Sequence, residues 1–430
     1  MADLSISFAG IKSPNPFWLA SAPPTNSGAQ IQRAFDLGWG GAVWKTLSVP
    51  IINVSSRLGS LDYGSARMMG LNNIELTTGR TWEVNVKEIR ETKKKYPRNA
   101  LLVSLMIESK KEAWQEAVKE MNDTGCDGLE LNFGCPHGMC ERGMGSAIGQ
   151  VPEYTQMITE WVTEVAEVPT VVKLTPNVTD VTHVARAAAA GGADGISLIN
   201  SVGSIMGVDL DTFAPLPAVD GKGTHGGYCG PAVKPIALNM VSACARDPKV
   251  GIAISGIGGI ATWQDAVEFM VLGATSVQVC TAVMHYGYRI VEDMIDGLSN
   301  WMDEKGYRKC TDFIGKAVPN VLDWGDLNLN YKVIARIDSD LCIGCELCHV
   351  AAWDGAHQCI DLEMGNGHRV PVINETECVG CNLCALVCPV DGCIRMIEVP
   401  TGRKPMSWAQ YQAELAKNPK MEPPGQVELH

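Results

Sequence analysis

The feature that most constrains the fold is a repeated alternation of short apolar runs with helix-like segments over the first 300 residues. A polar or glycine-rich loop follows each run, and segments such as 110–125 and 181–192 then end in glycine, as helices often do. Strands that are apolar along their whole length are typical of a parallel sheet covered on both faces. The runs are FWLAS ending at Ser21, AVWKTL around Lys45, LLVSLM at 101–106, GLELNF ending at Phe133, TVVKLT ending at Thr175, GISLIN ending at Asn200, GIAISG ending at Gly256 and SVQVCT ending at Thr281.

Eight such units predict an α/β protein built on a (β/α)8 TIM barrel, with an open doubly wound sheet as the alternative. Polar residues at the C-terminal ends of different runs favour the barrel. In a barrel these ends meet at one mouth, where the chemistry of such enzymes is located, whereas an open sheet spreads them along an edge. The residues concerned are Ser21, Lys45, Asn132, Lys173, Asn200 and Thr281.

The composition and charge of the 430 residues narrow the class of protein. With 46% hydrophobic and 19% charged residues the chain is typical of a folded soluble protein. Its net charge of -13 argues against a general binder of nucleic acid or of anionic membranes. No basic segment opens the chain and no apolar run approaches the ~18 residues of a membrane span, so we expect no signal peptide and a cytoplasmic protein.

Cysteines divide the chain, because seven of the sixteen precede residue 311 and nine lie between Cys342 and Cys393. In a reducing compartment closely spaced cysteines indicate metal rather than disulfides. This shift marks a domain boundary and predicts a barrel domain over 1–317, a linker over 318–334, a cysteine-rich domain over 335–400 and a polar tail over 401–430.

The run CVGCNLCALVCP has the C-x2-C-x2-C-x3-C-P spacing of bacterial [4Fe–4S] clusters, and zinc sites seldom use four cysteines so closely spaced. An upstream copy, CIGCELCHVAA, has Ala352 at its fourth position. Since the fourth cysteine of each run binds the other run's cluster, one site lacks its expected ligand. We expect Cys359 to replace it, the alternatives being a non-cysteine ligand, a three-iron cluster or Cys393. The expected sets are Cys342, Cys345, Cys348 and Cys388 for one cluster, and Cys378, Cys381, Cys384 and Cys359 for the other.

Two lysines inside strand runs, Lys45 and Lys173, indicate a bound anion, because burying an ammonium without one is costly. A reduced flavin carries negative charge near N1 and C2=O and would meet this need. An ion pair with a carboxylate is the alternative for each lysine. Glycines in SGIGGI at 255–260, with CTAV at 280–283, match the usual phosphate site of barrels. We find no G-x-G-x-x-G unit for a nicotinamide cofactor.

Amide side chains and one thiol complete the predicted mouth. Asn73, Asn132 and Asn200, with Ser201, offer donors and acceptors to the edge of a planar ring, although a single such asparagine is often only a turn residue. Cys135 could protonate a carbon that has just gained a hydride, or could be a small buried hydrophobe. It opens a loop with five glycines that could close over a substrate; Cys140 lies farther from the strand end and ranks below it.

Residues 4–400 resemble the PreA-type pyrimidine-reducing subunits of bacterial dihydropyrimidine dehydrogenase and the C-terminal part of the long mammalian enzyme. The cysteine runs and seven other segments carry the resemblance: NPFWLASAPPT, NNIEL, LELNFGCPHGMCERGMG, KLTPNVTD, GGYCGPAVKPIAL, GIGGI and VQVC. It implies an FMN-binding TIM barrel followed, over 335–400, by a two-cluster ferredoxin-like α+β domain that holds two [4Fe–4S] clusters. It also makes Cys135 the catalytic thiol. The implied FMN contacts are Ala20, Ser21, Lys45, Thr46, Asn73, Asn132, Lys173, Asn200, Gly230, Gly258, Gly259, Cys280 and Thr281. The implied substrate contacts are Asn73, Glu75, Leu76, Asn132, Gly134, Asn200 and Ser201. The chain departs from the mammalian pattern at Gly134, where that pattern has serine, and at Ala352, where a cluster cysteine is expected.

The resemblance also implies a mechanism. Electrons pass singly through the clusters to FMN, hydride passes from N5 of FMN to C6 of uracil or thymine, and Cys135 protonates C5. Because the chain lacks a nicotinamide-binding unit, we expect a hetero-oligomer with a PreT-like partner subunit that binds FAD and NAD(P)H. Three alternatives stay open. A dihydroorotate dehydrogenase-like enzyme would need a further cation at the mouth to bind the carboxylate of orotate. A tRNA-reducing flavoprotein is opposed by the acidic net charge, and the third alternative is a non-catalytic electron carrier.

Overall fold

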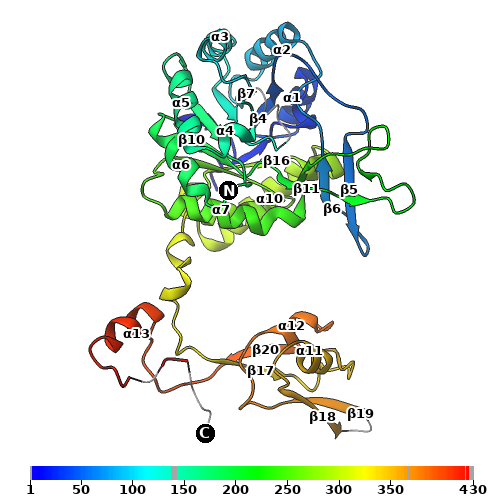
Figure 1. The fold of residues 1–430 in the computed structure, drawn as a ribbon, viewed down its shortest axis with the longest axis vertical. Coiled ribbons are helices and arrows are strands. Elements are labelled where there is room, and N and C mark those ends of the chain that lie inside the picture. Colours follow the sequence, from blue (N-terminus) through cyan, green and yellow to red (C-terminus); the bar gives the residue numbers. More distant parts are fainter. Residues whose placement is uncertain (1, 137–142, 366–367, 422, 426–430) are drawn as a thin grey trace. The chain divides into compact units, whose positions relative to one another are not determined.

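The computed structural model describes residues 2–136, 143–365, 368–421 and 423–425 (Figure 1). Cys140 and its neighbours in the predicted loop lie outside the described residues. The chain divides into two compact units, Met1–Asn320 and Val321–His430, which we call the N-terminal and C-terminal units.

Eight parallel strands of the N-terminal unit close into a barrel, which confirms the predicted fold and shows that the open-sheet alternative is wrong. Closure is made by β16 pairing with β3, with Val277 beside Phe17. Each strand corresponds to one of the eight predicted runs. In barrel order they are β3 (Phe17–Leu19), β4 (Gly41–Leu47), β7 (Ala100–Leu105), β8 (Gly128–Asn132), β9 (Thr170–Lys173), β10 (Gly195–Leu198), β15 (Ala253–Ile257) and β16 (Ser276–Val279).

Amphipathic helices surround the barrel (Figure 1). In α3, for example, the buried residues Trp114, Ala117, Val118 and Met121 recur at helical spacing, so one face packs inward. Full burial of each large apolar side chain stabilises the fold by about 1.5–3 kcal/mol. The helices are α1 (Gly28–Asp36), α2 (Trp82–Lys95), α3 (Lys111–Asn122), α4 (Ser146–Gly149), α5 (Pro152–Thr163), α6 (Val181–Ala190), α7 (Lys234–Arg246), α8 (Trp263–Val271), α9 (Thr281–Tyr286) and α10 (Ile290–Lys305).

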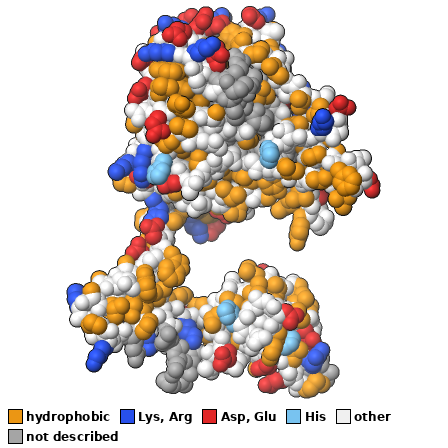
Figure 2. All heavy atoms as spheres, in the orientation of Figure 1, with side chains coloured by type: hydrophobic (Ala, Val, Ile, Leu, Met, Phe, Trp, Pro, Cys, Tyr) orange, Lys and Arg blue, Asp and Glu red, His pale blue; other side chains and the backbone are white. Residues whose placement is uncertain are grey.

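Antiparallel strands that the sequence analysis did not identify accompany the barrel. A four-stranded sheet in the order β11, β14, β6, β5 brings Asn73 at the end of β6 beside Gly227 of β14. Around this sheet Tyr63, Leu210 and Phe213 are exposed, and Figure 2 shows hydrophobic side chains gathered there. The strands are β1 (Ile6–Phe8), β2 (Ile11–Ser13), β5 (Leu58–Tyr63), β6 (Ala66–Asn73), β11 (Val202–Ser204), β12 (Gly207–Val208), β13 (Pro215–Leu216) and β14 (Gly226–Cys229).

Within its described residues the C-terminal unit has two antiparallel strand pairs and three α-helices. Its strands are β17 (Val333–Ile337), paired with β20 (Ile394–Glu398), and β18 (Ile360–Gly365), paired with β19 (His368–Ile373). Its helices are α11 (Leu347–Gly355), α12 (Leu383–Val387) and α13 (Trp408–Leu415). Helix α13 lies within the segment expected to be only a polar tail, and Ser407 and Gln410 form a capping box at its start. Among the helices of the described residues, none has the length and apolar character needed to cross a bilayer.

Candidate active site and metal sites

A cavity of about 480 Å³ opens at the C-terminal ends of the barrel strands. All thirteen residues that the resemblance assigned to FMN line it, although they come from segments spread over the whole barrel. They are Ala20, Ser21, Lys45, Thr46, Asn73, Asn132, Lys173, Asn200, Gly230, Gly258, Gly259, Cys280 and Thr281.

Six of the seven expected substrate contacts line the same cavity: Asn73, Glu75, Leu76, Asn132, Asn200 and Ser201. The seventh, Gly134, is not among the lining residues. A Cβ added there would lie 2.5 Å from Asn200 Cβ and 2.7 Å from Asn200 Nδ2, so Gly134 packs directly against that side chain. Its N–H donates to Asn132 Oδ1 at 3.2 Å. Gly134 therefore supports two lining asparagines instead of forming part of the wall itself.

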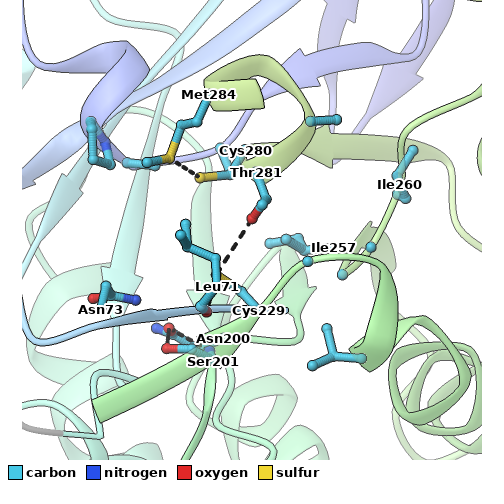
Figure 3. A pocket seen from close by; sticks show the side chains of 18 of the residues that line it. Leu71, Asn73, Asn200, Ser201, Cys229, Ile257, Ile260, Cys280, Thr281 and Met284 are labelled. Atoms are coloured by element: carbon cyan, nitrogen blue, oxygen red, sulfur yellow. Dashed lines mark hydrogen bonds between the residues drawn. The ribbon is translucent and has the colours of Figure 1, made fainter. Parts of the chain in front are cut away.

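Hydrogen bonds fix the orientation of the lining amides. Asn200 Nδ2 donates to Asn132 Oδ1 at 3.0 Å, and Asn132 Nδ2 donates to Thr46 Oγ1 at 3.1 Å. Asn73 Nδ2 donates to the Gly227 carbonyl at 3.1 Å. In Figure 3 Asn73, Asn200 and Ser201 lie together on one side of the pocket, with Cys280 and Thr281 on the other. One side of the cavity thus presents oriented amides, which suits a planar ring bearing C=O and N–H groups.

Both predicted lysines line the cavity and both also have carboxylate partners, as the ion-pair alternative expected. Lys45 Nζ lies 2.8 Å from Glu75 Oε2, and Arg57 Nη1 lies 2.9 Å from the other oxygen of the same carboxylate. Lys173 Nζ lies 3.7 Å from Glu130 Oε1. The cavity therefore has two buried ammonium groups, each with a carboxylate within 4 Å.

Cys135 lines the cavity and is 6% exposed. Its side chain also packs with Met106, Met144 and Leu76, so it lies both on the cavity wall and in a small apolar cluster. The Ser146 N–H donates to the Cys135 carbonyl at 3.0 Å, which ties α4 back to the strand end. Burial raises the pKa of the Cys280 thiol, which also lines the cavity, to about 12, so that thiol stays neutral at physiological pH.

Three glycines with positive φ form a narrow part of the cavity wall: Gly230, Gly258 and Gly259. A Cβ at Gly258 would lie 2.7 Å from Ala237 Cβ, and a Cβ at Gly259 would lie 2.8 Å from Lys234 Cβ. Only glycine fits at either position, because a Cβ there would clash with α7. Since both glycines line the cavity and have no side chain, the wall here is bare backbone, as phosphate binding requires.

Gln278 provides a further test of whether the cavity suits a flavin. Its side chain is buried at the cavity wall, and its Oε1 accepts no hydrogen bond within the described part of the chain. A buried acceptor of this kind requires a donor, and the imide N–H of a flavin ring is one. With the glycines and the two ammonium groups, the lining residues fit FMN.

Cysteines of the C-terminal unit surround two separate cavities. Cys378, Cys381, Cys384 and Cys359 line one of them, and Ala352 lines it as well. The Gln358 N–H donates to the Ala352 carbonyl at 3.0 Å, so the chain turns back and brings Cys359 to the place where a cysteine at 352 would have served. This arrangement supports the expected role of Cys359.

The second cavity is lined by Cys342, Cys345, Cys348, Cys388 and Cys393. Cys388 thus lies with the upstream run, as the exchange of fourth ligands predicts. Cys393 does not line the cavity of Cys359, which argues against it as the substitute ligand there. Within the described residues no three potential ligands converge on a point suited to one ion. Each cysteine of a cubane cluster binds a different iron, so the thiols of one ligand set surround a cavity.

The sequence analysis missed Glu130 and Gln278, two buried polar residues of the barrel interior beside this site. Both sit in the middle of apolar strand runs. The available signal was the presence of a carboxylate and an amide where a buried strand normally carries aliphatic residues.

Comparison with known proteins agrees with this geometry. Residues 3–302 match the family model "Dihydroorotate dehydrogenase" and residues 335–396 match "4Fe-4S dicluster domain". The chain is 42% identical over 399 residues to the NAD-dependent dihydropyrimidine dehydrogenase subunit PreA of Escherichia coli (strain K12), covering 92% of this chain and 96% of that protein. It is 41% identical over 328 residues to the chloroplastic dihydropyrimidine dehydrogenase (NADP(+)) of Arabidopsis thaliana, covering 74% and 77%. To the catalytic subunit of dihydroorotate dehydrogenase B (NAD(+)) of Pyrococcus abyssi it is 36% identical over 322 residues, covering 73% and 99%.

These matches confirm an oxidoreductase built as a flavin barrel with a two-cluster domain, with FMN and two [4Fe–4S] clusters as its cofactors. The chain belongs to the dihydroorotate dehydrogenase family and, within it, to the PreA-type subunits of dihydropyrimidine dehydrogenase.

Proposed function

We propose that this chain reversibly reduces the C5–C6 double bond of uracil or thymine, with Cys135 as the proton donor. The observation that carries the proposal is that the thiol, the oriented asparagines, the two lysines and the glycines all line one cavity. A proton donor, groups that recognise an amide ring and groups suited to a flavin therefore face the same space.

Recognition of the ring would use its alternating C=O and N–H groups. Asn132 and Asn200 are held rigidly by their mutual hydrogen bond, and Asn73 is held by Gly227. Glu75, fixed between Lys45 and Arg57, adds an acceptor that suits a ring N–H. Such buried polar groups would be left without partners by a ring lacking C=O and N–H, which is the basis of selectivity.

Protonation at C5 is the step assigned to Cys135. FMN held by Lys45, Lys173 and the three cavity glycines would supply a hydride to C6 of the pyrimidine. The electron pair of the broken π bond then takes the Cys135 proton at C5, leaving a thiolate that regains its proton from water. A thiol can donate a proton in this direction and, as the thiolate, accept one in the reverse direction.

Electrons would reach FMN through the two clusters from a PreT-like partner subunit that carries FAD and uses NAD(P)H. Two observations support this part: the sequence contains no dinucleotide-binding motif, and the E. coli relative is named a subunit of an NAD-dependent enzyme. We place the complex in the cytoplasm, because nine closely spaced thiols require a reducing compartment.

Dihydroorotate oxidation is the second candidate, favoured by the similarity to the Pyrococcus abyssi subunit. Glu75 opposes it, because this carboxylate lines the cavity and engages both Lys45 and Arg57. The carboxylate of orotate would approach a like charge while the cations nearest to it are already paired.

The test is turnover of uracil, thymine and orotate by the purified chain with its cofactors, reduced chemically so that no partner is needed. Uracil or thymine should be reduced and orotate should not. Cys135→Ala should lower the rate by about 10²- to 10⁴-fold, the usual contribution of a general acid, while FMN content stays unchanged. Cys126→Ala, which removes a buried thiol outside the cavity, is the matched control. Faster turnover of orotate, or full activity of Cys135→Ala, would overturn the proposal.

A further inference from the structure

A carboxylate lies inside the barrel next to the cavity without lining it. Glu130 belongs to β8 and is 0% exposed. It contacts Gln278 of β16, which lies on the opposite side of the closed barrel, so its side chain points into the barrel interior. The mechanism described above makes no use of this group.

The contacts of Glu130 connect it to two residues of the cavity wall. Its Oε2 accepts from Ser197 Oγ at 2.9 Å and from Gln278 Nε2 at 3.3 Å. Its Oε1 has no hydrogen-bond partner in the described part of the chain, and the nearby cation is Lys173 Nζ at 3.7 Å. Lys173 and Gln278 line the cavity, and Glu130 does not.

Charge balance explains why this arrangement is stable. A fully buried carboxylate is costly without a cation, and Lys173 provides one. A separation of 3.7 Å is too long for a strong hydrogen bond, so the ammonium is attracted to Glu130 without being locked to it. Lys173 can therefore donate a hydrogen bond to a ligand in the cavity while it is still attracted by the Glu130 carboxylate.

We propose that Glu130 is a positioning residue for the flavin site, acting through Lys173 and Gln278. It holds both side chains at the cavity wall, and its negative charge partly offsets the positive charge of Lys173. Reduced FMN is consequently stabilised less than Lys173 alone would stabilise it, and the flavin becomes a better hydride donor. The inference depends on FMN in this cavity and not on which pyrimidine is reduced.

The test is the midpoint potential of FMN, measured by spectroelectrochemical titration of the cofactor-loaded chain without any pyrimidine. Glu130→Gln keeps the shape of the side chain and removes its charge. The potential should become more positive, so that the ratio of reduced to oxidised FMN at a fixed potential rises by at least about tenfold. Ser197→Ala, which removes one hydrogen bond to the same carboxylate but keeps its charge, should leave the ratio nearly unchanged.

An unchanged or more negative potential in Glu130→Gln would overturn the proposal, and so would an equal shift in Ser197→Ala, which would indicate general loosening of the barrel interior. If Glu130→Gln does not fold, the double variant Glu130→Gln/Lys173→Met decides. It should unfold at a higher temperature than Lys173→Met alone, because that single change leaves a buried charge unpaired. If the double variant does not unfold at a higher temperature than Lys173→Met, the pairing of Glu130 with Lys173 is contradicted. A shifted potential without uracil turnover would reject the proposed function and leave this inference intact.

Discussion

The ammonium of Lys45 and the carboxylate of Glu75 form an ion pair of 2.8 Å on the wall of the cavity. Glu75 is also bound by Arg57, so one partly buried carboxylate engages two cations. This relationship accounts for a cavity that suits a neutral pyrimidine, since the cations that an additional carboxylate would need are already paired.

Glu75→Gln should therefore change the choice of substrate. Loss of the negative charge leaves Lys45 and Arg57 without their carboxylate, so orotate should bind more tightly and the ratio of orotate to uracil turnover should rise. Turnover of uracil should fall by about 10- to 100-fold, the effect of losing a charged hydrogen-bond partner. Steady-state kcat/KM for both substrates measures the change.

The matched control for this variant is Glu292→Gln, which removes a carboxylate paired with Arg289 on the exposed surface. Its substrate ratio should equal that of the unmodified chain. A ratio that also stays constant in Glu75→Gln would show that this carboxylate does not govern selectivity.

Asp265 lies next to the glycine-rich part of the cavity wall, and its charge should make the stability of the fold depend on pH. Its Oδ2 accepts from the Ala261 N–H and the Thr262 N–H, both at 2.9 Å, and its Oδ1 lies 2.7 Å from Lys234 Nζ. Although burial acts to raise it, these hydrogen bonds and the Lys234 ammonium lower the pKa of Asp265 below 3.8. Its stabilisation is therefore present above pH 3.8 and is lost as the pH falls through the lowered value.

Asp265→Asn should lower the free energy of unfolding by about 1–2 kcal/mol at neutral pH, through the lost ion pair and the weakened cap of α8. The difference from the unmodified chain should shrink as the pH falls below about 4. Affinity for FMN should also weaken, since Ala261 lines the cavity. Urea unfolding at several pH values and FMN titration measure these effects, and a difference independent of pH would contradict the assignment to the charge of Asp265.

The sequence predicted the parts of the fold that follow from local pattern. All eight barrel strands and the helices at 111–122 and 181–190 were predicted from apolar runs and spacing, because a strand buried on both faces leaves a continuous apolar signature. The sheet of β5, β6, β11 and β14 was not predicted. Its strands expose many residues, carry no continuous apolar run, and pair across distant parts of the chain.

The site shows the same limit. Lys45, Lys173 and Cys135 were found because a charge or thiol at a strand end is visible in the sequence. The carboxylate partners of the two lysines were not predicted. Nothing in the sequence around Glu130 indicates that it faces Lys173 of the next strand. The position of Gly134 against Asn200 is a tertiary contact, which no single-sequence pattern records.

Cys359 should be required for one cluster and Cys393 for neither. Cys359→Ala removes the thiol that shares a cavity with Cys378, Cys381 and Cys384, so that cluster should lose one iron. Iron and sulfide content should fall, and electron paramagnetic resonance of the oxidised chain should show a three-iron signal. Cys393→Ala is the matched control, because Cys393 lines the other cavity together with four other cysteines. The opposite outcome, with cluster loss in Cys393→Ala alone, would reject the ligand sets.

Gly134→Ser introduces the residue that the mammalian pattern has at this position. In this chain its Cβ would approach Asn200 Cβ to 2.5 Å, closer than carbon atoms tolerate, so Asn200 must move. Asn200 is bonded to Asn132, and both line the cavity, so the displacement should disturb the side that we assign to the pyrimidine. We expect KM for uracil to rise by about tenfold, the effect of one weakened buried hydrogen bond, with FMN content unchanged. Gly207→Ser is the matched control, because a Cβ at Gly207 meets nothing within 4 Å. A KM that is equal in the two serine variants would show that Asn200 can adjust without cost, and that the tight contact at Gly134 does not position the substrate-binding amides.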